Sequence, residues 1–293
     1  MLSRYGHPRL DNMIATRFTK MVGCALPIQL AAMGGVGTTE LAAAVAAAGG
    51  LGMVPAGTEP SEPMCGVNFL MPFNPSLDDI AAAARTCRVV EFFYADPRED
   101  VVSAVHGAGA LAGWQVGSGA EAAAAEKAGC DYVVAQGTEA GGHVRGKLSL
   151  DDVLAQVLSS VRIPVVAAGG IATAERTAEV IRSGADAVRV GTRFVTSPES
   201  AAHPIYVRML LAASAADTVL TEWFDEGWPN APHRVLRSSQ VAAETSGWKA
   251  VWPPYRDVDR YPGDMAMYAG MGVGDVKLSM PAAEVVADLV RLL

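Results

Sequence analysis

The residues best suited to chemistry lie in the stretch Gln-Gly-Thr-Glu-Ala-Gly-Gly-His, from Gln136 to His143. This stretch ends the mostly apolar run 131–135 with an abrupt change to glycine and polar residues, which is typical of a buried barrel strand that opens into an active-site loop. Gly141 and Gly142 would let a flat ligand approach the backbone, and His143 offers an imidazole that titrates near neutrality, at the rim. The stretch therefore predicts a binding surface with one acid–base group. The alternative is a glycine-rich turn with a solvent-facing histidine.

Two later glycine elements predict a phosphate site. Gly169 and Gly170 follow one apolar run, and Gly191 and Thr192 follow the next. In (β/α)8 barrels the loops after the seventh and eighth strands often bind phosphate, because backbone amides and a hydroxyl hold a dianion without a cationic surface. The alternative is that glycine relieves crowding at strand ends. Flavin mononucleotide (FMN), a nucleotide monophosphate and a sugar phosphate all remain candidate ligands.

The elements that must position these residues alternate in type along the chain. Short apolar runs are separated by alanine-rich segments with helical character, some of which start at a capping residue such as Ser76 or Thr173. Strands that are apolar throughout and separated by helices predict a parallel sheet, and eight such units predict a closed (β/α)8 TIM barrel. The expected strands are 27–33, 51–55, 65–71, 89–94, 111–116, 132–136, 164–168 and 187–190, and the expected helices are 39–48, 77–86, 97–108, 120–128, 149–160 and 173–183.

Two regions depart from this alternation. Between residues 55 and 64, Pro60 and Pro63 leave little room for a helix, so we expect an abbreviated crossover. The tail, residues 201–293, carries four of the five tryptophans and predicts a C-terminal capping extension with a final helix. We therefore expect a cofactor-binding barrel core over residues 1–215, a capping and substrate extension over 216–280, and a helix over 281–293 that packs back on the barrel.

Composition excludes several classes of protein. The chain has 293 residues, of which 51% are hydrophobic and 18% charged, and its net charge is −8. A disordered chain is excluded, and no overall field would attract nucleic acid or an anionic membrane surface. The four cysteines show no CxxC spacing, which favours reduced thiols over a disulfide frame or a zinc site.

Targeting and cofactor motifs are also informative. Residues 1–20 have no apolar segment of the signal-peptide type, and glycines and a proline interrupt the uncharged stretches 21–39 and 41–58, so we expect a cytoplasmic protein without membrane partners. No complete GxGxxG in a Rossmann context and no GxxxxGK[ST] occurs. His7, His106, His203 and His233 lack ligands at metal spacing and are interpreted as surface or capping residues, so no metal is expected.

With these motifs assembled, the chain resembles the nitronate monooxygenase family of FMN-dependent barrel oxidoreductases, formerly 2-nitropropane dioxygenases. The resemblance extends from about residue 27 to residue 194. It rests on Pro27–Gly35, on Gly66-Val67-Asn68-Phe69, on Gln136–His143 as the most specific match, and on the two glycine elements. A Met at 271, where relatives often carry Gln, predicts a changed substrate pocket on that side.

The resemblance implies a cofactor and roles for individual residues. FMN would bind with Asn68, Gln136 and Gly141 near its ring or ribityl chain and with Met33 packed beside the isoalloxazine. Its phosphate would lie against Gly169, Gly170, Gly191 and Thr192. His143 would be the catalytic residue, holding or deprotonating the acidic carbon or nitro group.

The expected activity is the oxidation of alkyl nitronates or nitroalkanes, with a small-molecule substrate, O2 as acceptor and no nucleic-acid partner. A homodimer is compatible with this expectation. The alternative on the same scaffold is an NAD(P)H-dependent quinone or enoyl-thioester (enoyl-acyl-carrier-protein) reductase, because relatives with that activity share the Glu-Ala-Gly-Gly-His motif. A non-catalytic phosphate-ligand-binding barrel is the alternative from another class.

Overall fold

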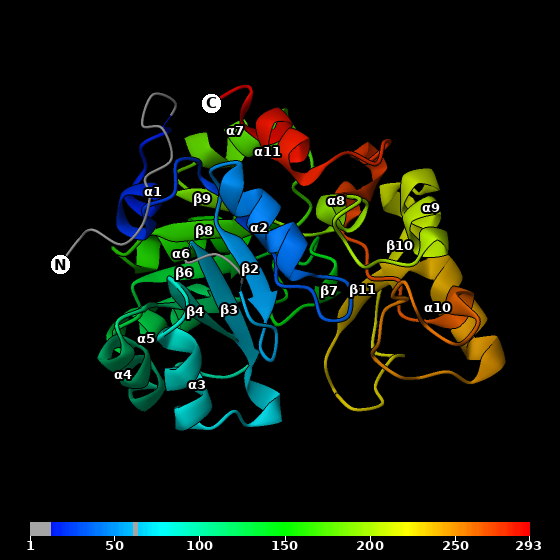
Figure 1. Cartoon of the computed structure of the whole chain (residues 1–293), viewed down its shortest axis with the longest axis horizontal. Helices are drawn as coiled ribbons and strands as arrows, with labels where there is room; N and C mark the ends of the chain where they lie inside the picture. The colour runs from blue at the N-terminus through cyan, green and yellow to red at the C-terminus, as the bar shows by residue number, and fades with distance from the viewer. Residues whose placement is uncertain (1–12, 61–63) are drawn as a thin grey trace.

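A parallel barrel forms the larger part of the molecule (Figure 1). The computed structural model describes residues 13–60 and 64–293. Eight parallel strands pair in the order β1-β9-β8-β6-β5-β4-β3-β2, and a bridge between Gln29 and Leu51 brings the two ends of the sheet together. The predicted (β/α)8 barrel is confirmed. Its strands are β1 (Ile28–Leu30), β2 (Gly52–Pro55), β3 (Cys65–Leu70), β4 (Val89–Phe93), β5 (Leu111–Val116), β6 (Tyr132–Gln136), β8 (Val165–Ala168) and β9 (Ala187–Val190).

Helices cover the outside of the barrel, and local capping sets where they begin. The Ser76 hydroxyl accepts from the Asp79 amide and the Thr173 hydroxyl from the Arg176 amide, as those residue types predict. The helix expected from residue 97, α4, begins instead at Glu99, because Arg98 keeps an extended backbone. The barrel helices are α1 (Arg17–Val22), α2 (Thr39–Ala47), α3 (Leu77–Ala84), α4 (Glu99–Ala108), α5 (Gly119–Lys127), α6 (Leu150–Ser160), α7 (Ala174–Arg182) and α8 (Thr192–Val195).

The second crossover carries no helix in its described residues, 56–60 and 64, as the prolines predicted. Residues 61–63, which include Pro63, lie outside the described residues. The described residues of this crossover therefore lack the helical cover that the other crossovers provide.

The C-terminal part forms a cap beside the mouth of the barrel (Figure 1). We use "the cap" for residues 216–280. Its strands β10 (Thr218–Thr221) and β11 (His233–Leu236) are antiparallel, and β11 also pairs with β7 (Gly142–His143), which belongs to the barrel loop after β6. The predicted motif loop therefore becomes the third strand of the cap sheet. Helices α9 (Pro204–Ala212) and α10 (Arg237–Ser246) flank this sheet, and α11 (Ala282–Val290) returns to pack on α2 and α7.

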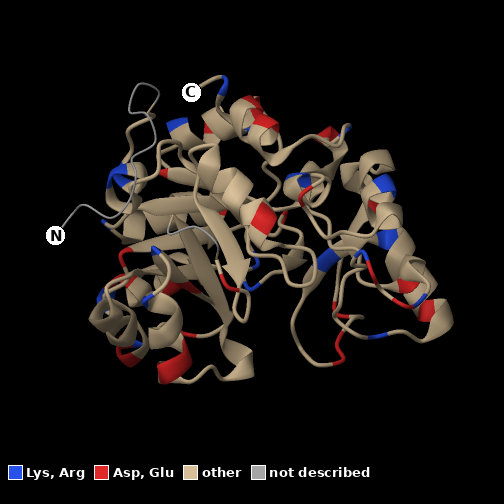
Figure 2. Cartoon of the chain, in the orientation of Figure 1, with Lys and Arg blue, Asp and Glu red and all other residues tan. Residues whose placement is uncertain are grey.

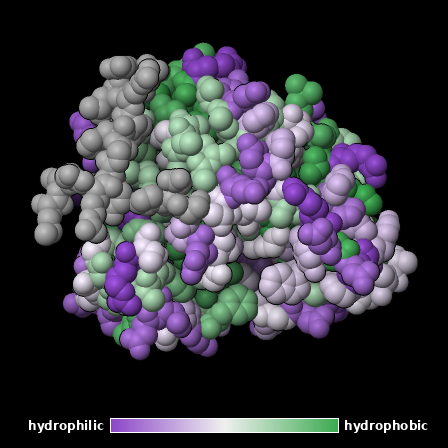
Figure 3. Space-filling view, viewed as in Figure 1, coloured by the Kyte–Doolittle hydropathy of each residue, from purple (hydrophilic) through white to green (hydrophobic). Residues whose placement is uncertain are grey.

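Charge and hydropathy are mixed over the surface. Lys, Arg, Asp and Glu are interspersed on the outer helices and the cap, while the sheet is largely free of them (Figure 2). The face in Figure 3 likewise mixes hydrophilic and apolar patches. Among the described residues, no helix combines the length and apolar character needed to cross a membrane.

Candidate active site

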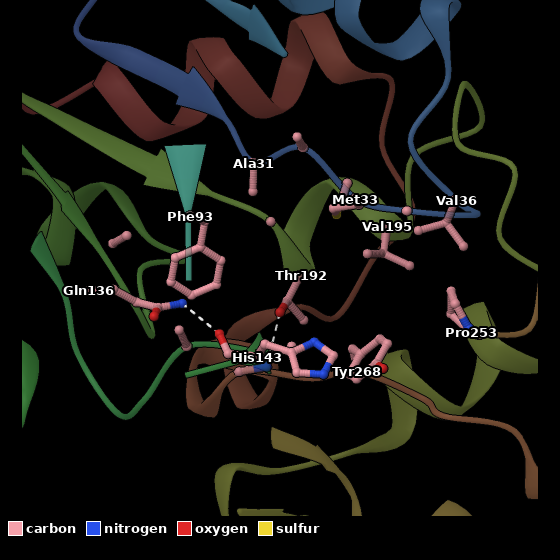
Figure 4. Close-up of a pocket in the computed structure, with 18 of the residues that line it drawn as sticks. Ala31, Met33, Val36, Phe93, Gln136, His143, Thr192, Val195, Pro253 and Tyr268 are labelled. Carbon is pink, nitrogen blue, oxygen red and sulfur yellow. Dashed lines mark hydrogen bonds between the residues drawn. The ribbon is translucent and has the colours of Figure 1, made fainter. Parts of the chain in front are cut away.

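One cavity lies between the carboxyl ends of the barrel strands and the cap, with a volume of about 550 Å³ (Figure 4). This is the end of a (β/α)8 barrel at which active sites occur. The fold brings every residue predicted for the site to its wall. These residues are Met33, Asn68, Gln136, Gly141, His143, Gly169, Gly170, Gly191 and Thr192.

His143 is held between the barrel and the cap. Its carbonyl oxygen accepts a hydrogen bond from Gln136 Nε2 at 2.9 Å, which ties the end of β6 to β7 (Figure 4). Its imidazole stacks on the Trp228 indole, with ring centroids 3.8 Å apart and an interplanar angle of 18°. The imidazole also lies 5.1 Å from the ring of His233, its cross-strand partner on β11. Its Nε2 atom is buried and has no hydrogen-bond partner among the described residues.

The expectation of a rim imidazole that titrates near neutrality is wrong. Burial, with a smaller contribution from His233, lowers the pKa of His143 from 6.5 to about 3. A dry environment disfavours the charged imidazolium, and a second imidazole nearby disfavours it further. His143 is therefore neutral at neutral pH, so it acts as a hydrogen-bonding group and only as a weak base. His233 is not a surface residue either, since it is fully buried and its own pKa is lowered mainly by burial.

Gln136 presents a second unpartnered atom to the cavity. Because its Nε2 donates to the His143 carbonyl, its Oε1 faces away from that bond, and Oε1 is buried without a partner among the described residues. A buried acceptor without a hydrogen-bond donor costs about 1–3 kcal/mol of stability. Such an atom at a cavity wall therefore indicates a ligand that donates to it. The flavin ring carries one N–H between two carbonyl groups, which matches this requirement. Asn68, 8% exposed, adds a further amide on the β3 side of the cavity.

The motif glycines have different reasons to be glycine. A Cβ at Gly141 would lie 2.5 Å from the Gly270 backbone nitrogen, so this glycine allows the cap backbone to approach. Gly142, by contrast, has nothing within 4 Å of such a Cβ but a φ of +81°. Its conformation, which L side chains rarely adopt, directs the chain into β7. Packing at Gly141 and chain direction at Gly142 add to the predicted reason for glycine, which is ligand access, and both residues line the cavity.

The predicted phosphate end of the cavity is built from backbone. Gly169 and Gly170 have φ values of +125° and +68°, and the amides of Gly170 and Ile171 make no hydrogen bond within the described residues. On the loop after the neighbouring strand β9, the Thr192 hydroxyl accepts from the Gly270 amide at 3.0 Å and donates to no partner among the described residues (Figure 4). The first amides of α8 have no partner within that helix. Amides from two loops and one hydroxyl thus fit a phosphate group.

Residues at the floor of the cavity escaped the sequence prediction. Arg189 forms an ion pair with Glu91, which is fully buried, and also bonds Gln29 and Gln115. Each of these residues is a polar position inside an otherwise apolar strand, and that signal could have identified them. The aromatic side chains of the cap also escaped, because nothing in the tail sequence fixes which of them reach the barrel. They are Trp228, Trp252 and Tyr268.

No metal centre is evident in the described part of the chain, where no group of three or more His, Cys, Asp and Glu side chains is arranged to hold an ion. The polar groups of the cavity include amides, hydroxyls and one neutral imidazole, together with the Arg189 guanidinium and the Glu226 carboxyl group. Such groups suit an organic cofactor.

Comparison with known proteins decides the family. The model of the nitronate monooxygenase family matches residues 65–291. The chain belongs to the nitronate monooxygenase family. As a member it is a flavin-dependent oxidoreductase, and the unpartnered Gln136 oxygen together with the two-loop phosphate cradle fits a flavin.

Relatives in and around this family carry different names. The chain is 32% identical over 267 residues to a nitronate monooxygenase of Pseudomonas aeruginosa, covering 70% of this chain and 76% of the relative. It is 30% identical over 249 residues to (3aS,4S,5R,7aS)-5-hydroxy-7a-methyl-1-oxo-octahydro-1H-indene-4-carboxyl-CoA dehydrogenase of Rhodococcus jostii, covering 80% of this chain and 69% of the relative. The structure of FabK from Thermotoga maritima superposes with a TM-score of 0.81 at 29% identity, covering 95% of this chain and 96% of that one. Membership of the family thus leaves the substrate open.

Proposed function

We propose that the protein binds FMN in this cavity and oxidises alkyl nitronates with O2 as the electron acceptor. The observation that carries the proposal is that two buried, unpartnered polar atoms, Gln136 Oε1 and His143 Nε2, belong to residues of one cavity wall. The first would accept from the cofactor ring and the second would face the substrate. The P. aeruginosa relative, named a nitronate monooxygenase, supports the same substrate class.

FMN is preferred over a dinucleotide because the cavity offers one phosphate cradle, at Gly170, Gly191 and Thr192, and the sequence has no Rossmann fingerprint. When bound, the flavin supplies the electron chemistry. The chain supplies orientation: Met33 and Ala31 line the cavity beside Gly191, and Asn68 and Gln136 line it from β3 and β6.

The low pKa of His143, about 3, favours a nitronate over a neutral nitroalkane as the substrate. A weak base removes a carbon-bound proton slowly, whereas a nitronate has already lost that proton. A neutral imidazole N–H can still donate a hydrogen bond to a nitronate oxygen, and a bond to a charged group contributes about 1.5–3 kcal/mol. His143 would therefore position the substrate anion.

The cap favours a second candidate, an NAD(P)H-dependent reductase of a quinone or enoyl thioester. Trp252 lines the cavity and is 57% exposed, and Trp228 and Tyr268 add aromatic surface nearby. Flat electron acceptors stack on such rings. The non-catalytic barrel is no longer a candidate, because members of this family are flavin-dependent oxidoreductases.

An anaerobic spectrum distinguishes the candidates. The protein loaded with FMN is mixed first with a preformed nitronate and then, in a separate sample, with NAD(P)H. Bleaching by nitronate and recovery of the spectrum with O2 is the expected result. Bleaching by NAD(P)H alone would replace the proposal with the reductase, and failure of the protein to take up FMN would overturn both.

Three further expectations stay proposals. The division into a barrel core (1–215), a cap (216–280) and a returning helix (281–293) is tested by truncation of the chain at these boundaries. A homodimer in solution is tested by sedimentation, and a cytoplasmic location by cell fractionation.

A further inference from the structure

A buried polar cluster lies directly beneath the cavity. Glu91, Gln29 and Tyr132 are fully buried, and their side chains bond one another: Gln29 Nε2 and the Tyr132 hydroxyl each donate to Glu91 Oε1, at 3.3 and 3.2 Å. Arg189 lies above them and donates to Glu91 and to Gln29 Oε1. Arg189 Nη1 also donates to Gln115 Oε1, which completes the cluster. Of these five residues, only Arg189 and Gln115 also line the cavity. The cluster therefore runs from the barrel interior to the cavity floor.

The orientation of the Gln115 amide follows from the chemistry of arginine. A guanidinium has only donors, so the atom of Gln115 that lies 2.6 Å from Arg189 Nη1 is its oxygen, Oε1. The amide nitrogen of Gln115 must then point away from Arg189. Gln115 is 6% exposed, and its Nε2 has no hydrogen-bond partner in the described part of the chain. Gln115 thus offers two N–H donors at the cavity floor.

Gln136 is fixed in the opposite sense. Its nitrogen is engaged by the His143 carbonyl, so its oxygen is the atom left without a partner. The cavity therefore presents a fixed amide donor from β5 and a fixed amide acceptor from the neighbouring β6. The pyrimidine edge of a flavin carries carbonyl acceptors on either side of one N–H donor, and it matches this pair.

We infer that Arg189, held in place by Glu91, is a positioning residue that fixes Gln115 as a donor to the C2 carbonyl edge of the flavin. The inference rests on the proposed binding of FMN. It adds a role for the buried ion pair, which is weak evidence for stability by itself. Because Glu91 fixes the guanidinium and the guanidinium fixes the amide, loss of the pair should act on the cofactor through Gln115.

The same arrangement bears on the redox state of the cofactor. Reduction makes the N1–C2 carbonyl edge of a flavin more electron-rich, and hydrogen bonds to that edge favour the reduced form. Arg189 places a positive charge next to the amide that donates to this edge, in surroundings where such interactions are weakly screened. The Arg189–Gln115 contact should therefore raise the reduction potential of the bound flavin.

Three variants test this role in the full-length protein. Gln115→Leu removes the donor. Glu91→Gln combined with Arg189→Gln removes the pair together, which avoids the unpaired buried charge that either single change would leave. The triple variant combines all three changes. Gln156→Leu, an exposed glutamine on α6, is the matched control. The measurements are the Kd of the apoprotein for FMN and the midpoint potential of the loaded protein.

The expected result is non-additive. Gln115→Leu should weaken FMN binding about tenfold and make the midpoint potential more negative, and so should Glu91→Gln combined with Arg189→Gln. The triple variant should bind FMN at most about twofold more weakly than Gln115→Leu alone. Losses that multiply to about a hundredfold in the triple variant, or a potential that stays at the wild-type value, would overturn the role of Arg189. A merely structural role would lower stability without moving the potential. Wild-type apoprotein that fails to bind FMN would instead overturn the proposed function.

Discussion

The imidazole of His143, on the barrel loop, stacks on the indole of Trp228, on the cap, with ring centroids 3.8 Å apart. Trp228 is 6% exposed and is itself packed edge-on by Tyr94, at 4.9 Å between ring centroids, and by Phe73, at 5.5 Å. The cap is therefore more than a cover over the barrel. It supplies the surface that keeps water from His143, and so it sets the protonation state of the group nearest to the proposed chemistry.

Removal of this stacking partner should restore an ordinary histidine. Trp228→Ala admits water to the imidazole, so the pKa of His143 should rise from about 3 toward 6.5, as measured by the NMR titration of its ring protons. The lost packing should also cost about 3–5 kcal/mol of stability. Trp252→Ala is the control, since Trp252 lines the same cavity but has no ring contact with His143 among the described aromatic pairs. A pKa that stays near 3 in Trp228→Ala would contradict this account.

The lowered pKa of His143 predicts a pH dependence of folding. Between about 3 and 6.5 the unfolded chain binds a proton that the folded protein does not, so stability should be complete above 6.5 and fall as the pH drops. One such group changes the free energy of unfolding by up to about 1.4 kcal/mol per pH unit. His143→Gln should flatten the difference between about pH 7 and pH 5, measured by urea unfolding. Parallel curves for the two proteins would show that His143 does not titrate in this way.

Substitution of Gly141 should disturb the contact between barrel and cap. Gly141→Ala places a Cβ 2.5 Å from the Gly270 nitrogen and 2.8 Å from the Ala269 carbonyl carbon, and the backbone cannot yield cheaply. A loss of about 1–3 kcal/mol is expected in thermal or urea unfolding. Gly107→Ala on α4, where nothing lies within 4 Å of the new Cβ, should instead stabilise by about 0.5–1 kcal/mol. Equal effects at the two positions would be inconsistent with the structure.

Gly191→Val should weaken FMN binding more than folding. A Cβ at this position would lie 3.2 Å from Ala31 Cβ and 3.7 Å from Met33 Sδ, both in cavity-lining residues, so a branched side chain would extend into the proposed phosphate end. The rise in Tm on adding excess FMN should be smaller in the variant than in the wild type. An unchanged rise would place the phosphate elsewhere.

His143 should act mainly by holding the substrate. His143→Ala is expected to leave FMN bound and to lower kcat/KM for a preformed nitronate about 10- to 100-fold, the equivalent of one hydrogen bond to an anion. Wild-type protein should also prefer the nitronate over the neutral nitroalkane, because the neutral imidazole is a weak base. Negligible losses for both substrates would show that His143 is a structural residue of the loop.

The sequence by itself determined the barrel, because the residue patterns that predict its strands and helices are local. Apolar runs that are buried on both faces, helix starts such as Ser76 and Thr173, and prolines at the second crossover each act within a few residues of chain. The glycine elements at 169–170 and 191–192 were placed in the same way, since the end of a strand fixes the end of the barrel. For this reason the predicted cofactor and catalytic residues all reach one cavity.

Only the tertiary structure decided how those residues behave. The environment of His143 depends on Trp228, which lies 85 residues later in the chain, and its sheet partner His233 also belongs to the cap. The pairing of Glu91 with Arg189 joins strands across the barrel interior. Burial, pKa and amide orientation arise from contacts between distant segments, which no local pattern specifies. The sequence therefore predicted an imidazole at the site, and the fold made it a neutral one.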